Sequence, residues 1–208
     1  MFRLYLVRHG ETVWNRQGRV QGHTDIPLSD RGLEQAKRLA ERLGGEKIDA
    51  IWSSDLQRAQ TTASAIAGQR GLEIVTTPML RETMLGEWEG LTEPEVIARG
   101  ESVLWNGWRN EPEIHRPPGS EPLENVWDRM ASVLQDIRAS LPAGTVVISG
   151  HGGSLRAIIC QAIGAPLSSL NRFSLENTSI SLIEYAAHRT WVRYVNDTCH
   201  LRTLDMTD

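Results

Sequence analysis

Apolar and polar residues alternate along the chain in blocks that predict strands and helices in turn. Short apolar runs predict buried strands at residues 3–7, 49–53, 72–76 and 145–149. Apolar residues at helical spacing predict helices that begin after Ser29 and after Ser54 or Asp55, and others over 123–141 and 155–163. Two further apolar runs, 178–185 and 191–196, predict a terminal hairpin.

This order of elements predicts an α/β fold over residues 1–208, built as a three-layer α/β/α sandwich. Strands that alternate with helices favour right-handed crossovers and a mostly parallel central sheet with helices on both faces. The stretch 77–122 breaks the pattern, because it is poorly periodic and rich in proline and tryptophan. We expect it to form an irregular or helical lid inserted into this single domain.

Composition excludes several classes of protein. The chain has 22 basic and 26 acidic side chains, a net charge of −4, which argues against a nucleic-acid partner. No apolar run reaches the roughly 18 residues needed to span a membrane, and the N-terminal run is too short for a secretory signal. Cys160 and Cys199 form no disulfide framework. We therefore expect a cytoplasmic protein with no membrane partner.

Basic side chains follow three of the predicted strands at the point where each strand ends. Arg8 and His9 follow the first strand, Arg58 follows the second, and His151 follows the fourth. Ligands of parallel sheets bind at the carboxyl ends of the strands, where helix N-termini also favour anions. Each residue alone has an ordinary structural explanation, but their convergence on one edge predicts a site for a phosphoryl group, which arginine binds through two N–H groups at once.

A metal centre is the alternative use of the two histidines. His9 and His151 could bind zinc, but the neighbouring arginines would repel a dication and no His-Glu-x-x-His pattern accompanies them. The glycine-rich loops that bind nucleotides are also absent from the sequence. The residues therefore favour phosphoryl chemistry without a metal site.

The segments around these strand ends resemble the motifs of the histidine phosphatase superfamily, whose best-known members are the phosphoglycerate mutases. The first is Leu-Val-Arg-His-Gly-Glu-Thr at residues 6–12, and the last is Ser-Gly-His-Gly-Gly at 149–153. Between them the order and spacing of the family continue at residues 14–15, 21–22, 25–29, 53–59, 61–62, 80–82 and 86–92. The resemblance therefore covers most of the chain.

The resemblance implies a role for each matching residue. His9 would be the nucleophile that becomes a phosphohistidine. Arg8, Arg58 and His151 would hold the phosphoryl oxygens, and Glu82 would donate a proton to the leaving oxygen and then accept one from water. Secondary substrate contacts would come from Asn15, Gln21, Gly22 and Gly152.

The choice of Glu82 as the acid is the least determined of these assignments. A carboxyl group that donates a proton near neutral pH needs surroundings that favour its protonated form, which Leu80 and Leu85 could provide. Glu87 and Glu89 lie nearby, and spacing alone does not exclude them.

The resemblance favours a short phosphatase over a mutase. The mutases continue Glu-Arg-His-Tyr-Gly after the acid, whereas residues 82–86 read Glu-Thr-Met-Leu-Gly. It implies a metal-independent phosphomonoester hydrolase that acts on a small phosphorylated metabolite and requires no cofactor. The alternatives are a phosphoglycerate mutase, which would use 2,3-bisphosphoglycerate, and a non-catalytic phosphate-binding module. Residues 118–121 read Pro-Gly-Ser-Glu where the short phosphatases carry Gly-Gly-Glu-Ser, which leaves the shape of that loop open.

The lid carries cations that could contact the leaving group. Arg109, His115 and Arg116 could meet a carboxylate or a sugar, although each is more often a solvated surface residue, and the lid tryptophans are more often packing residues. The terminal hairpin could present an edge for a homodimer. The substrate itself stays open.

Overall fold

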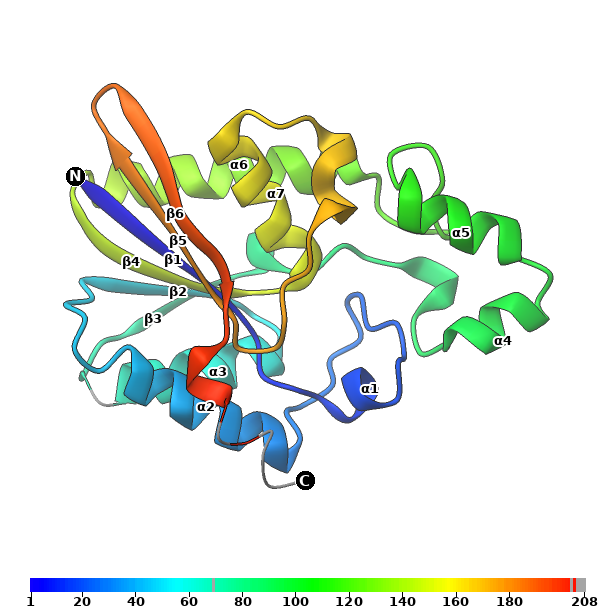
Figure 1. The fold of residues 1–208 in the computed structure, drawn as a ribbon, viewed down its shortest axis with the longest axis horizontal. Helices are drawn as coiled ribbons and strands as arrows, with labels where there is room; N and C mark the ends of the chain where they lie inside the picture. The colour runs from blue at the N-terminus through cyan, green and yellow to red at the C-terminus, as the bar shows by residue number, and fades with distance from the viewer. Residues whose placement is uncertain (69, 203, 205–208) are drawn as a thin grey trace.

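The computed structural model describes residues 1–68, 70–202 and 204. In this part of the chain six strands form one sheet in the order β3-β2-β4-β1-β5-β6 (Figure 1). Their bounds are Phe2–Arg8 (β1), Ala50–Ser54 (β2), Ile74–Thr77 (β3), Gly144–Gly150 (β4), Ile180–Ala186 (β5) and Arg189–Asp197 (β6). The first four pair in parallel and the terminal hairpin is antiparallel, as predicted.

Helices cover both faces of the sheet (Figure 1). They are α2 (Asp30–Arg42) and α3 (Gln57–Gly68) on one face, and α6 (Leu123–Ser140) and α7 (Gly152–Ile163) on the other. Among the described residues, each helix is too short or too polar to cross a membrane. The three layers confirm the expected α/β/α sandwich.

Strand β1 lies between the two hydrophobic cores. Leu4 and Leu6 pack into the core under α6 and α7, whereas Tyr5 and Val7 pack into the core under α2 and α3. Successive side chains of a strand point to opposite faces, so a strand covered on both faces must be apolar throughout. This explains the apolar run at residues 4–7 in the middle of β1.

Helix α7 begins earlier than predicted. The expected start near Leu155 is wrong, because the helix begins at Gly152, directly after His151 in an extended conformation (φ −129°, ψ 168°). The apolar periodicity begins only at Leu155, so glycines in the first turn hid the true start. The correction places the N-terminal N–H groups of α7 beside His151.

The segment between β3 and α6 is partly helical. It contains the short helices η1 (Pro78–Leu80), η2 (Gly86–Trp88), α4 (Glu93–Ala98) and α5 (Ser102–Asn110). Trp88, Trp105 and Trp108 contact one another there, with ring centroids 5.2 to 5.6 Å apart. The tryptophans pack against each other, as expected. The remaining short helices are α1 (Val13–Arg16), η3 (Leu167–Arg172) and η4 (Cys199–Leu201).

Removal of the cap of α2 tests how local sequence stabilises this scaffold. The Ser29 side chain accepts the backbone N–H of Gly32 at 3.1 Å, as predicted for a helix start. We expect Ser29→Ala to lower the free energy of unfolding by about 1 kcal/mol in urea titrations. Ser132→Ala, on the exposed face of α6, is the matched control and should change it by less than about 0.5 kcal/mol. Equal stability of the two variants would contradict the prediction.

Candidate active site

The predicted cluster forms at the carboxyl edge of the sheet. Parallel pairing aligns Arg8 with Gly150, and the His9 N–H donates to the Gly150 carbonyl at 3.0 Å. The rings of His9 and His151 therefore lie 5.2 Å apart, centroid to centroid. Arg58 lies in the first turn of α3 and is also buried. The structure thus brings together the four residues predicted from the strand ends.

Hydrogen bonding determines which nitrogen of His9 is free. Nδ1 lies 2.7 Å from the Gly10 carbonyl, which can only accept, so Nδ1 carries the proton and Nε2 keeps its lone pair. Burial, reinforced by Arg8 and Arg58, holds the pKa of His9 well below its ordinary value. His9 is therefore a neutral imidazole with an available nucleophilic nitrogen at neutral pH.

Two buried donors at this edge have no partner among the described residues. Arg58 donates through Nε to Nδ1 of His151 at 3.3 Å, so the proton of neutral His151 is on Nε2. That Nε2 and the Nε of Arg8 are both buried without an acceptor within the described chain. Unpaired buried donors are costly. Their convergence from β1 and β4 suits an anion such as a phosphoryl group.

Arg58 is also tied to the loop before α2. Its Nη1 donates to the Thr24 carbonyl and its Nη2 to the Gly22 carbonyl, both at 2.8 Å. A guanidinium carries five N–H groups, so two of those on Arg58 remain for an acceptor outside the described residues. Burial lowers the pKa of Arg58 to about 10, which leaves it charged at neutral pH. Gly22 has a positive φ of 53°, and a Cβ there would lie 2.0 Å from a Glu89 oxygen, so glycine is required.

Asn15 and Gln21 hold the loop after His9 through their amide oxygens. The Asn15 oxygen accepts the Thr12 N–H at 3.0 Å, and the Gln21 oxygen accepts the Thr12 hydroxyl at 3.1 Å. Asn177 donates to the His9 carbonyl at 2.9 Å. Within the described residues the amide nitrogens of Asn15 and Gln21 make no hydrogen bond, so both can donate to a ligand. Asn177 was missed by the sequence analysis because it contacts His9 from 168 positions away.

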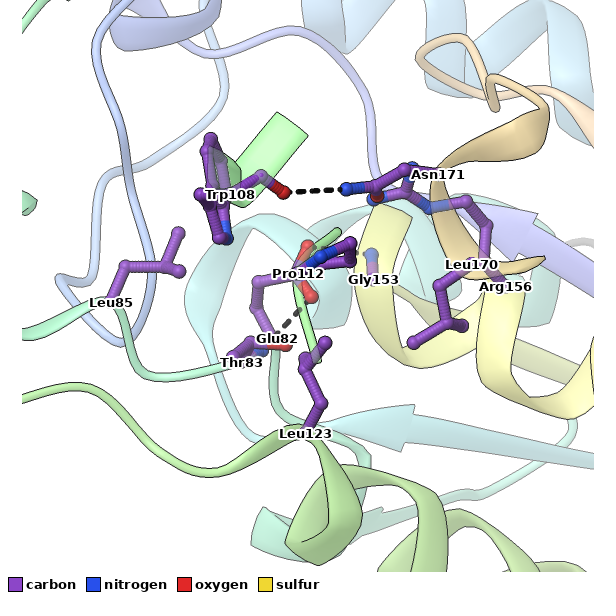
Figure 2. Close-up of a pocket in the computed structure, with 10 residues that line it drawn as sticks. All are labelled: Glu82, Thr83, Leu85, Trp108, Pro112, Leu123, Gly153, Arg156, Leu170 and Asn171. Carbon is purple, nitrogen blue, oxygen red and sulfur yellow. Dashed lines mark hydrogen bonds between the residues drawn. The ribbon is translucent and has the colours of Figure 1, made fainter. Parts of the chain in front are cut away.

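The Glu82 carboxylate lies at the N-terminus of α7 (Figure 2). It accepts backbone N–H groups from Thr83 at 2.9 Å, Gly153 at 3.0 Å and Ser154 at 3.1 Å. Leu85, one of the two leucines named from the sequence, lines the same cavity as Glu82, so the carboxylate has apolar neighbours beside these three donors. A Cβ on Gly153 would lie 2.4 Å from Oε1 of Glu82, whereas one on Gly152 would make an ordinary contact of 3.7 Å with Oε2. Gly153 therefore allows the carboxylate to approach the helix end.

The main chain at Glu82 is held by two residues that the sequence analysis missed. His23 Nε2 contacts the Glu82 carbonyl at 2.8 Å. Arg129, on α6, donates to the same carbonyl at 2.9 Å and to the Arg81 carbonyl at 2.7 Å, and forms an ion pair with Glu121 at 3.0 Å. His23 follows the motif at residues 21–22, which was a usable signal. No sequence signal pointed to Arg129, because its partner Glu82 lies 47 positions away in the chain.

The other carboxyl candidates occupy different positions. Glu87 is exposed. Glu89 accepts the Thr24 N–H and hydroxyl and the Leu85 N–H. Burial raises the pKa of Glu89, but these hydrogen bonds outweigh it and the net pKa is lowered. Arg81 pairs with Asp55 at 2.6 Å rather than with Glu82. The geometry favours Glu82 as the carboxyl group of the site.

The predicted lid cations lie at the surface. Arg109 is exposed, 3.6 Å from Glu93. His115 lies 3.7 Å from Glu111, and Arg116 is exposed. Across the described residues, no group of three or more His, Cys, Asp or Glu side chains could hold a metal ion.

Comparison with known proteins gives consistent matches over nearly the whole chain. Residues 4–198 match the family model described as "Histidine phosphatase superfamily (branch 1)". The chain is 37% identical to phosphoserine phosphatase 1 of Hydrogenobacter thermophilus, over 97% of this chain and 95% of that protein. It is 36% identical to phosphoglycerate mutase-like protein 4 of Arabidopsis thaliana, over 95% and 86%. A solved mycobacterial glucosyl-3-phosphoglycerate phosphatase superposes with a TM-score of 0.88 at 30% identity, over 94% of this chain and 99% of that one.

The buried histidines predict how stability depends on pH. Burial, with Arg58 and His9 nearby, also holds the pKa of His151 well below its ordinary value of 6.5. Below pH 6.5 these histidines are protonated in the unfolded chain but stay neutral in the folded protein. The free energy of unfolding therefore falls as pH falls, by roughly 1 kcal/mol per pH unit for each histidine. This loss of stability ends only below the pKa of each histidine in the folded protein.

Urea unfolding of His151→Gln across pH 5 to 8 would measure this dependence, with pH values chosen around the ordinary histidine pKa of about 6.5. The variant should lose less stability than the wild type as the solution is acidified. The exposed His188 supplies the control, and His188→Gln should keep the wild-type slope. A slope unchanged in His151→Gln would contradict the assignment of His151 as a buried neutral group.

Proposed function

Because the chain belongs to the histidine phosphatase superfamily (branch 1), we propose that it is a phosphomonoester hydrolase that acts on a small phosphorylated metabolite through a phosphohistidine on His9. One observation carries this proposal. The free Nε2 of His9 lies in the same buried site as the unpaired Nε of Arg8 and the unpaired Nε2 of His151. A nucleophile and donors for equatorial oxygens are the main needs of phosphoryl transfer.

In the first step, Nε2 of His9 attacks the phosphorus atom in line with the bond to the leaving oxygen. The N–P bond forms while that P–O bond breaks, and the leaving oxygen takes a proton from Glu82. Nδ1–H keeps its hydrogen bond to the Gly10 carbonyl, which stabilises the positive charge of the ring. Arg8, Arg58 and His151 supply donors to the phosphoryl oxygens.

In the second step, water attacks the phosphohistidine and Glu82 accepts its proton. The O–P bond to water forms, the N–P bond breaks, and His9 returns to its starting state with release of phosphate. The backbone N–H groups at Gly153 and Ser154 suit a carboxyl group that is ionised for this step. No step requires a metal ion or a cofactor.

The phosphatase named above in Hydrogenobacter and the mycobacterial phosphatase support hydrolysis over mutase activity. The substrate named for each of these two enzymes is a phosphate ester of a three-carbon acid. Phosphoserine and phosphoglycerates are therefore the first substrates to test. A cytoplasmic location and a lid role for residues 77–122 belong to the same proposal, and the predicted homodimer stays a prediction.

The nucleophile is tested by His9→Ala with p-nitrophenyl phosphate in the presence of a chelator. We expect kcat/KM to fall by roughly 1,000-fold or more, because no other group can form the covalent intermediate. The wild type should form an acid-labile phosphoenzyme that the variant lacks. His188→Ala is the matched control and should keep full activity.

Three results would reject this proposal. If the wild-type protein releases phosphate from no ester, the non-catalytic phosphate-binding module is the remaining explanation. Interconversion of phosphoglycerates dependent on 2,3-bisphosphoglycerate would establish the mutase. Loss of turnover on chelation would establish metal chemistry.

The acid is tested by comparing two leaving groups in Glu82→Gln. An alkyl phosphate needs a proton on its leaving oxygen, so kcat/KM should fall roughly 100- to 10,000-fold. p-Nitrophenyl phosphate releases a stable phenolate and should lose far less. Glu87→Gln should behave as the wild type with both esters, because that side chain is exposed. An equal loss for both esters in Glu82→Gln would exclude it as the proton donor.

A further inference from the structure

Arg156, on α7, is a partly buried cation that the mechanism above does not use. Its Nε donates to the Gly152 carbonyl at 3.0 Å, which fixes the direction of the side chain. In residues 1–68, 70–202 and 204, its terminal nitrogens have no hydrogen-bond acceptor, and no carboxylate lies within ion-pair distance of it. The guanidinium is thus held in place by Nε, with its terminal Nη1–Nη2 edge free among the described residues.

The free end of Arg156 lines a cavity that begins at Glu82 (Figure 2). The cavity has a volume of about 130 Å³ and is also lined by Gly153, Trp108 and Asn171. In Figure 2 the Arg156 side chain extends from α7 toward Asn171. With Glu82 as the proposed proton donor to the leaving oxygen, the rest of the leaving group would extend into this cavity, which Glu82 lines.

A second cavity, of about 500 Å³, shares Trp108, Arg156 and Asn171 with the first. It adds Arg109 and Arg172, both exposed. Among the residues that line the two cavities, Glu82 is the sole acidic side chain. Arg109 also lies 3.6 Å from Glu93, so Arg156 and Arg172 are the cations that make the end of the cavity opposite Glu82 electropositive.

Electrostatics around Arg156 agree with this geometry. Burial lowers the pKa of Arg156, and the Glu82 carboxylate partly offsets that effect. An added anion would further stabilise the charged guanidinium. Arginine is suited to such a contact because two of its N–H groups match the two oxygens of a carboxylate or phosphate.

We propose that Arg156 forms a second anion-binding subsite, which selects phosphate esters whose leaving group carries its own negative group. This inference rests on the proposed function, because it assumes that the leaving group lies beyond Glu82. The subsite orients a small leaving group with its anion toward Asn171. Arg109 and Arg172 lie farther out and attract the same anion during entry.

The subsite is tested with pairs of esters that differ in one anionic group. 3-Phosphoglycerate is compared with glycerol 3-phosphate, in which CH₂OH replaces the carboxylate. Glucose 1,6-bisphosphate is compared with glucose 6-phosphate, which tests a second phosphate. The wild type should prefer the anionic member of at least one pair, and the preferred pair identifies the carboxylate or the phosphate as the recognised group.

In Arg156→Gln we expect kcat/KM for the preferred anionic ester to fall roughly 10- to 100-fold. The ester with the uncharged leaving group should change much less, so the preference disappears. Arg156→Lys should recover only part of the preference, because lysine keeps the positive charge but lacks the paired N–H groups of the guanidinium. Arg189→Gln, in the β5–β6 hairpin, is the matched control and should keep the wild-type preference. Thermal unfolding checks that each variant is folded.

Arg156 lies near Glu82 and could serve only to position that carboxylate; the same data separate this role from anion binding. An equal fall for charged and uncharged esters in Arg156→Gln would show that Arg156 only positions Glu82 and would overturn the subsite. A wild type with no preference in either pair would also overturn it. Calorimetric binding to His9→Ala, with and without Arg156→Gln, measures the preference without turnover. Failure of hydrolysis would therefore reject the proposed function alone, and equal binding of both esters would reject the subsite alone.

Discussion

The parallel pairing of β1 with β4 is the constraint on which the site depends. The register aligns Arg8 with Gly150, so the residues that follow each strand, His9 and His151, must emerge side by side. The His9 N–H continues the ladder to the Gly150 carbonyl, and the Gly10 carbonyl then fixes the His9 tautomer. A shift of one residue would point these side chains to the opposite faces of the sheet. Backbone hydrogen bonds thus position the chemistry.

This edge concentrates positive charge in a protein whose net charge is −4. Burial disfavours the charged state of imidazoles and guanidiniums alike. The histidines become neutral because their ordinary pKa is about 6.5, whereas Arg58 stays charged because its lowered pKa is still about 10. The Glu82 carboxylate is the attraction shared by Arg8, Arg58 and Arg156. The surface carboxylates repel polyanions, while the buried edge can still bind one small phosphate ester.

The N-terminus of α7 connects Glu82, the proposed proton donor, to the proposed phosphoryl site. Its first turn presents the N–H groups of Gly153 and Ser154 to Glu82, and Arg156, one turn later, faces the cavity beyond it. Because glycine occupies position 153, the carboxylate can approach the backbone of the helix. Glu82, from the segment after η1, and Arg156, from α7, therefore meet at one helix end.

The sequence by itself determined the α/β/α layers, the mostly parallel sheet and the gathering of Arg8, His9, Arg58 and His151. These features depend on periodicity and on where each strand ends, and both are local properties of the chain. The start of α7, the polar setting of Glu82 and the support from Arg129 were decided by tertiary structure. Glu82 meets its N–H donors on α7 across 71 and 72 positions, and Arg129 reaches the Glu82 carbonyl across 47. Such contacts exist only once packing has brought distant segments together, so no local pattern encodes them.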